Sequence, residues 1–487
     1  MLDSHRSCPD GLKSTMKNLI FDRSDDVSTA DLKKLYIATF GCQMNDYDSQ
    51  RMAQILRNRY VLTSRPEEAD LVLVNTCAIR EKAENKAYSL LGRFRKLKKL
   101  RPEMVIGITG CVAQLEGGRL LHRMPFLDLV IGPLEIYRLP EILEDGRAAE
   151  KWPSVHTELD RDFSIPLVRA PLPENNPVRT FVTIMQGCDN FCTYCVVPNV
   201  RGREISRPPG DIVAEVEHVL AQGVREVILL GQNVNSYGKK NRDYPCFSGL
   251  LRAVAGVPGL ERLRFTTSHP RDLTSDIMKC FREVPQLCEH LHLPVQSGST
   301  GILKRMNRHY TRDQYLSTVD RLKSICPEIV LTTDLIVGFP GETDSDFLDT
   351  LSLLETVEFE QIFPFKYSPR PGTRAASFED QVPLHVQNER FEEVLRVQNE
   401  IGMRRHKVLE GRKQEVLIEG PSRGDRSEIT GRTRGNHVIN LPGPAELAGE
   451  VVTVEIERAC CHSLRGRLPG SVSLQDEGFT SVTNELY

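Results

Sequence analysis

Residues 186–203 read QGCDNFCTYCVVPNVRGR and hold three cysteines at short spacing, Cys188, Cys192 and Cys195. The strand-like run FVTIMQG (181–187) leads into them, so we expect this loop at the carboxyl end of a strand, where α/β folds place their sites. Three thiolates so spaced are typical of an iron–sulfur cubane, and three protein ligands leave one iron open to a small molecule. The alternatives are a zinc site or thiols that are close by chance. Zinc requires four ligands, and the next cysteine lies about fifty residues further on.

The composition is that of a globular protein of about three domains, with 487 residues, 40% hydrophobic and 26% charged. No apolar run approaches the roughly twenty residues that span a bilayer, so we expect no membrane association. Residues 1–32 lack the apolar core of a signal peptide, and thirteen cysteines without an export signal favour metal or redox chemistry in the reducing cytoplasm. Because the net charge is only -3, any binding of RNA must come from local patches.

The first third of the chain alternates strand-like and helical segments, which predicts a parallel α/β sheet. The expected strands are 35–40, 69–76, 104–110 and 127–132. Cys42, Cys77 and Cys111 each follow one of these strands, with gaps of 35 and 34 residues. Parallel strands put their carboxyl ends on one edge, so we expect the three thiols to converge and to form a second cluster site with an open iron. The alternative is that they are buried cysteines acting as small apolar residues.

The quoted motifs resemble known families. The C-x3-C-x2-C spacing, with Tyr194 before the third cysteine, resembles the radical S-adenosylmethionine (SAM) superfamily, in which the methionyl part of SAM chelates the open iron. Four stretches together resemble the tRNA methylthiotransferases, over about residues 33–470: FGCQMNDYDS (40–49), VNTCAIREKAENK (74–86), TGCVAQ (109–114) and MQGCDNFCTYCVVPNVRGRE (185–204). Within that family they are most similar to the branch acting on N6-isopentenyladenosine.

The resemblance implies two [4Fe-4S] clusters. Cys188, Cys192 and Cys195 would hold the cluster that binds SAM, and the three strand-end cysteines would hold an auxiliary one. It further implies that reductive cleavage of SAM gives a 5'-deoxyadenosyl radical, which removes the hydrogen from C2 of adenosine 37 in the anticodon loop. Sulfur then comes from the auxiliary cluster and methyl from a second SAM. The implied partners are tRNA, an electron donor and a sulfur donor. We expect a monomer and name no catalytic side chain, since no general base is required.

The middle of the chain predicts six parallel strands with helices between them. These strands are 181–187, 226–231, 262–267, 290–295, 329–338 and 361–368. Six strands are too few to close an eight-stranded barrel. We therefore expect an open (β/α)6 partial barrel of the TIM type, as the superfamily resemblance also implies, with one side left for a large substrate.

The loops after these strands should line the SAM pocket. By resemblance we choose Tyr194, Gln232, Asn233, Gln296 and Gly338 as contacts, although each loop alone could be an ordinary turn. His269 lies in a Ser-His-Pro tripeptide that resembles the isopentenyladenosine branch, and we interpret it as a marker of substrate class, not as a catalyst. The basic cluster at 304–312 is a candidate for phosphate binding.

The last segment has five short β-like runs joined by Gly and Pro turns, which predicts a small barrel. It resembles the TRAM domain, an RNA-binding barrel, although a barrel that only packs on the core is the alternative. The best candidates for RNA contacts are arginines in its turns: Arg423, Arg426, Arg432 and Arg434. The expected organisation is a disordered tail (1–32), an N-terminal domain with the auxiliary cluster (33–149), the radical SAM core (174–408), the TRAM-like barrel (409–472) and a frayed tail (473–487).

Two other functions fit parts of this pattern. One is a methylthiotransferase acting on threonylcarbamoyladenosine in tRNA or on a ribosomal protein, although a protein substrate would leave the cationic turns of the last domain unexplained. The other is a non-catalytic RNA-binding iron–sulfur protein, against which the retained SAM-pocket loops argue.

Overall fold

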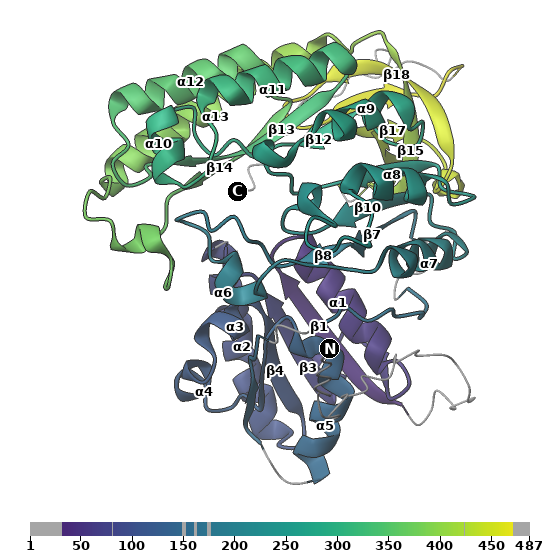
Figure 1. Ribbon diagram of the computed structural model, residues 1–487. Coiled ribbons are helices and arrows are strands. Elements are labelled where there is room, and N and C mark those ends of the chain that lie inside the picture. Colours follow the sequence, from purple (N-terminus) through teal and green to yellow (C-terminus); the bar gives the residue numbers. More distant parts are fainter. Residues whose placement is uncertain are drawn as a thin grey trace, which may run out of the picture.

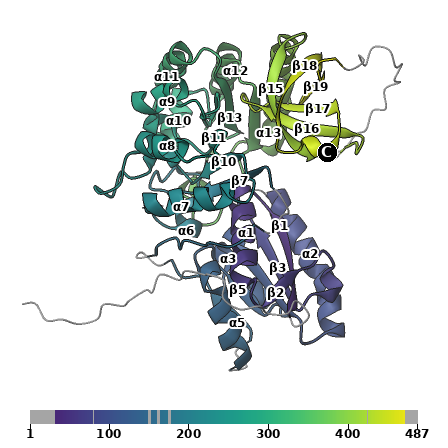
Figure 2. The same cartoon turned by 90° about the vertical axis from the view of Figure 1, so that its right-hand side faces the viewer.

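The computed structural model describes residues 32–79, 81–148, 152–159, 163–172, 177–422 and 424–470. An N-terminal α/β domain lies below a half-barrel, and a small β-barrel packs beside the half-barrel (Figures 1 and 2). The expectations for the tails at 1–31 and 473–487 concern residues outside this description. Among the described residues, no helix is both long enough and apolar enough to cross a membrane.

The N-terminal domain is built on a six-stranded parallel sheet. In spatial order its strands are β2 (Tyr60–Leu62), β1 (Lys33–Phe40), β3 (Leu71–Thr76), β4 (Val105–Gly110), β5 (Leu129–Ile131) and β6 (Ser154–His156). The four predicted strands are all present. The sequence analysis missed β2 and β6, which are three-residue edge strands with partly exposed side chains and so lack the apolar run of a central strand.

Helices cover both faces of this sheet, and each face encloses its own apolar core. On one face lie α1 (Gln43–Leu56) and α5 (Leu139–Ala148); on the other lie α2 (Glu81–Leu100), α3 (Cys111–Glu116) and α4 (Arg119–Arg123). Only two residues stand between α3 and α4. Gly117 separates them because its φ of 51° ends the first helix.

The central domain is the predicted open half-barrel. Its six parallel strands are β7 (Arg179–Thr183), β10 (Glu226–Leu230), β11 (Arg262–Phe265), β12 (His290–His292), β13 (Val330–Val337) and β14 (Gln361–Lys366). They form two three-stranded sheets, β7-β10-β11 and β12-β13-β14. Between these sheets, Leu263 of β11 exchanges backbone hydrogen bonds with residues 286 and 288. The strands thus follow one another in chain order, and their carboxyl ends share one edge.

Helices pack on the outside of the half-barrel around one large apolar core. They are α7 (Pro209–Leu220), α8 (Phe247–Ala255), α9 (Ser275–Glu283), α10 (Thr300–Arg305), α11 (Arg312–Ile325), α12 (Asp344–Val357) and α13 (Leu384–Lys407). Single 3-10 turns occur at η2 (Pro66–Glu68), η3 (Glu135–Arg138), η4 (Val234–Ser236), η5 (Pro270–Asp272), η6 (Arg374–Ser377) and η7 (Ala445–Leu447).

The strand predicted over 181–187 is shorter than expected. β7 ends at Thr183, and β8 (Met185–Gln186) pairs antiparallel with β9 (Ile205–Ser206). This short pairing joins the two ends of the cysteine loop, whose only helix is α6 (Val197–Arg201). The loop therefore leaves the edge of the sheet and returns to it, and its two ends are paired with each other.

The C-terminal domain is a closed barrel of β15 (Lys413–Pro421), β16 (Glu428–Thr433), β17 (Val438–Pro442), β19 (Leu464–Arg467) and β18 (Val451–Ala459). It docks on the amino ends of the half-barrel strands, opposite the cysteine loop. Arg264 of β11 donates hydrogen bonds to the carbonyl oxygens of Arg434 and Thr433, at 2.7 and 2.8 Å. The adjacent Arg262 binds the carbonyl oxygen of Arg432 at 2.6 Å.

Candidate active site

The cysteine loop begins at a position that only glycine can occupy. Gly187 has φ 76°, and a Cβ added to it would lie 2.0 Å from the carbonyl oxygen of Arg203, on the returning end of the loop. Its N–H donates to Gln232 Oε1 at 2.6 Å, which ties the loop to the end of β10. Backbone contact and strand pairing together fix where Cys188 starts the loop.

Polar side chains reach two of the three thiols of this loop. Arg308 Nη1 lies 3.5 Å from Cys192 Sγ, and Arg308 Nη2 donates to the carbonyl oxygen of Pro294 at 2.8 Å. Asn190 Nδ2 lies 3.5 Å from Cys188 Sγ. The guanidinium thus places a positive charge beside Cys192, and the Asn190 amide can donate to Cys188.

Without a metal, the loop is costly to ionise. Burial raises the pKa of Cys188, and it raises the pKa of Cys195 to about 12, with Cys192 as the second cause. Three thiolates packed together therefore require positive charge among them, which an iron–sulfur cluster supplies. The donor set and its surroundings fit such a cluster.

The predicted SAM contacts lie on the strand ends around this loop, but they are held in different ways. Asn233 is buried and donates to Asp272 at 2.7 Å, and Gln296 has φ 75° and hydrogen-bonds through its backbone to β13. Gly338 also has positive φ, 69°. Tyr194 packs with Phe339 and the apolar cluster around it, and its hydroxyl lies 3.5 Å from Arg308.

Several buried polar atoms at this edge have no hydrogen-bond partner among the described residues. They follow or end β7, β8, β10 and β11: Thr183 Oγ1, Gln186 Nε2, Gln232 Nε2, Asn235 Nδ2, Ser268 Oγ and His269 Nε2. Such atoms cost free energy unless a ligand or water satisfies them. Their concentration beside the cysteine loop fits a polar ligand such as SAM.

His269 lies in surroundings that disfavour a second proton on its imidazole ring. Its side chain is 4% exposed and stands edge-on to Tyr310, with ring centroids 5.6 Å apart. Burial, together with Arg308 and Arg271 nearby, holds the pKa of His269 far below its usual range. Burial thus favours the neutral imidazole. The interpretation of His269 as a marker of substrate class stays a prediction.

The three N-terminal cysteines lie at one edge of the N-terminal sheet. β1, β3 and β4 are adjacent, and Cys42, Cys77 and Cys111 follow their carboxyl ends at the start of helices or loops. Cys77 hydrogen-bonds to the Cys42 thiol, and this lowers the pKa of Cys42 to about 6. That hydrogen bond and burial raise the pKa of Cys77, whereas burial raises the pKa of Cys111. A thiolate on Cys42 that accepts from Cys77, with Cys111 nearby, fits a metal site better than three inert apolar cysteines.

A buried amide network supports this second site. Asn45 donates to Asn75 Oδ1 at 3.0 Å, Asn75 donates back to the Asn45 carbonyl oxygen at 2.9 Å, and the Cys42 backbone N–H donates to Asn45 Oδ1 at 3.3 Å. Gly110, with φ 90°, lies against this network, and a Cβ there would be 2.4 Å from Asn75 Oδ1 and 2.7 Å from the Thr76 carbonyl oxygen. Gly110 packs so closely that no side chain fits at its position. This packing positions Cys111, the next residue.

Arg201 links the two sites, and the sequence analysis did not single it out. It ends α6, six residues after Cys195, and its guanidinium binds Asp48 of α1 at 2.6 Å, with both side chains about one-twentieth exposed or less. Its charge favours the thiolates of Cys42 and Cys111. α6 packs on α3, so the loop that carries one set of cysteines also covers the other. The only sequence signal was its place in the VRGR motif.

The predicted RNA-binding arginines occupy three environments. Arg426 is exposed in the turn between β15 and β16, and Arg423 lies outside the described residues. Arg432 pairs with Glu419 at 2.8 Å, and Arg434 pairs with Glu289 of the half-barrel at 2.7 Å. The last two therefore have protein partners, and Arg434 holds the barrel to the core.

The basic cluster at 304–312 is likewise engaged with protein. Arg305 pairs with Asp380 at 2.7 Å, and Arg312 donates to Ser352 at 3.1 Å and to backbone carbonyls. Arg308 is buried against the cysteine loop, as described above. Lys304 is exposed.

Comparisons with known proteins agree with this three-part architecture. Residues 34–132 match the uncharacterized protein family UPF0004, residues 182–354 the radical SAM superfamily, and residues 407–468 the TRAM domain. The tRNA-2-methylthio-N(6)-dimethylallyladenosine synthase of Geobacter metallireducens is 51% identical over 90% of this chain and 98% of its own length. The chain belongs to this synthase family. The enzyme of the same name from Syntrophotalea carbinolica is 46% identical over 89% of this chain and 99% of its own length.

Solved structures resemble the fold at low identity. The apo form of the cobalamin-dependent S-adenosylmethionine radical enzyme OxsB matches with a TM-score of 0.50 and 11% identity. The match covers 74% of this chain and 56% of that one. This likeness concerns the fold alone.

Proposed function

We propose that the protein replaces the C2 hydrogen of N6-isopentenyladenosine, at position 37 of tRNA, with a methylthio group, at the expense of two SAM. The observation that carries the proposal is the pairing of two three-cysteine sites in one chain whose 51% identical relative bears the name of this synthase. We place this reaction in the cytoplasm, where an external electron donor would reduce the protein and a sulfur donor would supply sulfur.

Cys188, Cys192 and Cys195 would hold the cluster that binds SAM. When bound, this cluster supplies the electron for reductive cleavage of SAM. The chain contributes charge and orientation: Arg308 offsets the thiolate of Cys192. The unpaired amide of Gln232 and the positive-φ backbones at Gln296 and Gly338 are suited to hold the amino acid part and to keep water out.

Cys42, Cys77 and Cys111 would hold a second [4Fe-4S] cluster, which would supply the sulfur. Cys42 carries the favoured thiolate, and Arg201 contributes the nearest positive charge. Because α6 is only five residues long, it spans about 8 Å and keeps the two sites near each other. A substrate base placed between them could meet both.

The tRNA would have to reach from one edge of the half-barrel to the other. The TRAM barrel docks at the amino ends of the strands, whereas both cysteine sites lie at carboxyl ends. β13 has eight residues and thus spans about 26 Å. A folded RNA bound through the exposed Arg426 turn can bridge this distance, with adenosine 37 splayed out of its single-stranded loop.

The test is nucleoside mass spectrometry of tRNA after incubation with reconstituted protein, SAM and reductant. The proposal expects the methylthio product only on tRNA that already carries N6-isopentenyladenosine at position 37. Product on threonylcarbamoyladenosine, or on a ribosomal protein instead of tRNA, would reassign the substrate. No SAM cleavage at all, under reducing conditions, would favour a non-catalytic RNA-binding iron–sulfur protein.

A further inference from the structure

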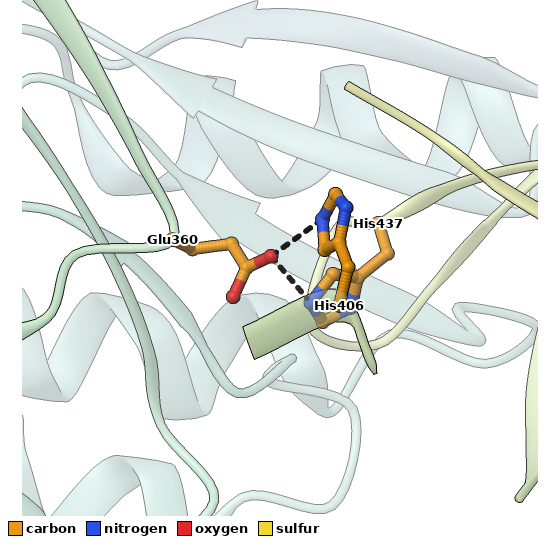
Figure 3. Close-up of side chains that lie close together, drawn as sticks. All are labelled: Glu360, His406 and His437. Carbon is orange, nitrogen blue, oxygen red and sulfur yellow. Dashed lines mark ion pairs between the residues drawn. The ribbon is translucent and has the colours of Figure 1, made fainter. Parts of the chain in front are cut away.

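Three metal-ligating side chains meet far from both cysteine sites, where the half-barrel joins the C-terminal barrel (Figure 3). Glu360 directly precedes β14, His406 lies at the end of α13, and His437 directly precedes β17. One ligand atom from each lies within 4.8 Å of the others. The three side chains are only 9%, 7% and 8% exposed. Residues from three separate elements are thus buried at one point.

Both imidazoles aim the same nitrogen at one carboxylate oxygen. His406 Nε2 lies 2.7 Å and His437 Nε2 lies 3.2 Å from Glu360 Oε1. The other oxygen, Oε2, accepts a hydrogen bond from Arg405 at 2.8 Å. The carboxylate is therefore oriented by the arginine, and Oε1 is presented to the two rings.

The far side of the His406 ring determines its tautomer. His406 Nδ1 is 2.6 Å from the carbonyl oxygen of Cys460, and because a carbonyl can only accept, Nδ1 carries the proton. In neutral His406, Nε2 then directs a lone pair at a carboxylate oxygen. That contact is repulsive unless a cation lies between the two atoms or the ring takes a second proton.

The donor set is one that zinc prefers. Two imidazole nitrogens and one carboxylate oxygen are frequent Zn²⁺ ligands, and ligating histidines usually hold their other nitrogen in a hydrogen bond that fixes the ring. His406 has the Cys460 carbonyl for this purpose, and His437 Nδ1 has the Thr433 hydroxyl at 3.0 Å. A second proton on His406 would let both rings donate to Glu360 Oε1, with His437 Nδ1 accepting from the Thr433 hydroxyl. A divalent ion would instead bind all three ligand atoms at once.

We propose that Glu360, His406 and His437, with a water as the fourth ligand, form a zinc site that fixes the C-terminal barrel on the amino edge of the half-barrel. The half-barrel, the connecting helix and the barrel contribute one ligand each, so the ion would act as a structural link. It would supplement the docking contacts of Arg262, Arg264 and Arg434 at the same junction.

The test uses the full chain, reconstituted anaerobically so that iron–sulfur clusters occupy the six cluster cysteines. The protein is equilibrated with Zn²⁺ in a competing chelator buffer, and zinc and iron are measured by mass spectrometry. The wild type should retain about one zinc per chain. His437→Gln should weaken zinc binding at least about 100-fold with iron unchanged. His462→Gln, an exposed histidine of the same barrel, is the matched control and should keep the zinc.

A second measurement does not depend on the variants folding. X-ray absorption at the zinc edge of the wild type should show nitrogen and oxygen neighbours at about 2.0–2.2 Å, with the signature of imidazole. Equal zinc in wild type and His437→Gln, or a zinc shell made of sulfur at about 2.3 Å, would overturn the proposal. Glu360, His406 and His437 would then form a hydrogen-bonded group without a metal ion.

Discussion

Each of the two sets of cysteines places three thiols near one another, but the two sets do so in different ways. Cys188, Cys192 and Cys195 share one loop, closed at its base by β8 and β9, whereas Cys42, Cys77 and Cys111 come from three strand ends that only the sheet brings together. The loop can hold its metal by local geometry. The strand-end site depends on the fold of a whole domain. It also depends on Arg201 of the loop segment, which pairs with Asp48 of α1. The strand-end site thus uses a residue of the segment that carries the other site, and the two are linked through Arg201.

The largest effect is expected when the loop thiols are removed. In Cys188/Cys192/Cys195→Ala, SAM cleavage should fall by more than about 10³-fold, because the cofactor carries that chemistry. Iron should fall from about eight to about four per chain. 5'-Deoxyadenosine formation and iron analysis measure the two effects. Cys280→Ala, a buried cysteine between α9 and α8, is the control and should lose neither.

The link between the sites can be broken at Arg201. Arg201→Met leaves the buried carboxylate of Asp48 without its partner, and this should cost about 3–5 kcal/mol of the free energy of unfolding. Denaturant titration measures the loss. Adding Asp48→Asn should restore part of it, since no charge is then left buried. If the single variant is as stable as the exposed Arg396→Met control, the two sites are not coupled through this pair.

A smaller effect is expected at the strand-end site alone. Gly110→Ala forces a Cβ against the Thr76 carbonyl oxygen at positive φ, and should cost about 3 kcal/mol and weaken the auxiliary cluster. Gly223→Ala has a similar φ, 92°, with open space around it, and should cost only about 1 kcal/mol. Thermal unfolding and iron content compare the two. Equal losses would mean that close packing does not position Cys111.

The smallest effect is expected on RNA binding. Arg426→Ala should weaken tRNA binding by about 1 kcal/mol. It should also reduce the slope of log K against log salt concentration by about one, as expected for one lost phosphate contact. Filter binding over a range of salt concentrations measures both. Arg434→Ala should instead loosen the barrel from the core, because its partner is Glu289. A larger salt effect for Arg434 than for Arg426 would reverse these assignments.

The sequence predicted what depends on local patterns. The six strands of the half-barrel, the five strands of the barrel and the convergence of the strand-end thiols follow from apolar runs, turn residues and the common direction of parallel strands. What the sequence could not predict rests on long-range packing. β6 is a three-residue edge strand, and Arg201 contacts Asp48 across 153 positions. Arg432 and Arg434 were expected to face RNA, but Arg432 pairs with Glu419 of the neighbouring barrel strand β15, and Arg434 pairs with Glu289 of the half-barrel.

The central claim is that the strand-end thiols hold a cluster separate from the one that cleaves SAM. The direct measurement compares wild type with Cys42/Cys77/Cys111→Ala for iron per chain, 5'-deoxyadenosine formed and methylthio groups found in tRNA. In the variant, iron should fall from about eight to about four per chain, SAM cleavage should continue, and the methylthio product should be lost. About four irons in both proteins, or methylthio product from the variant, would contradict it.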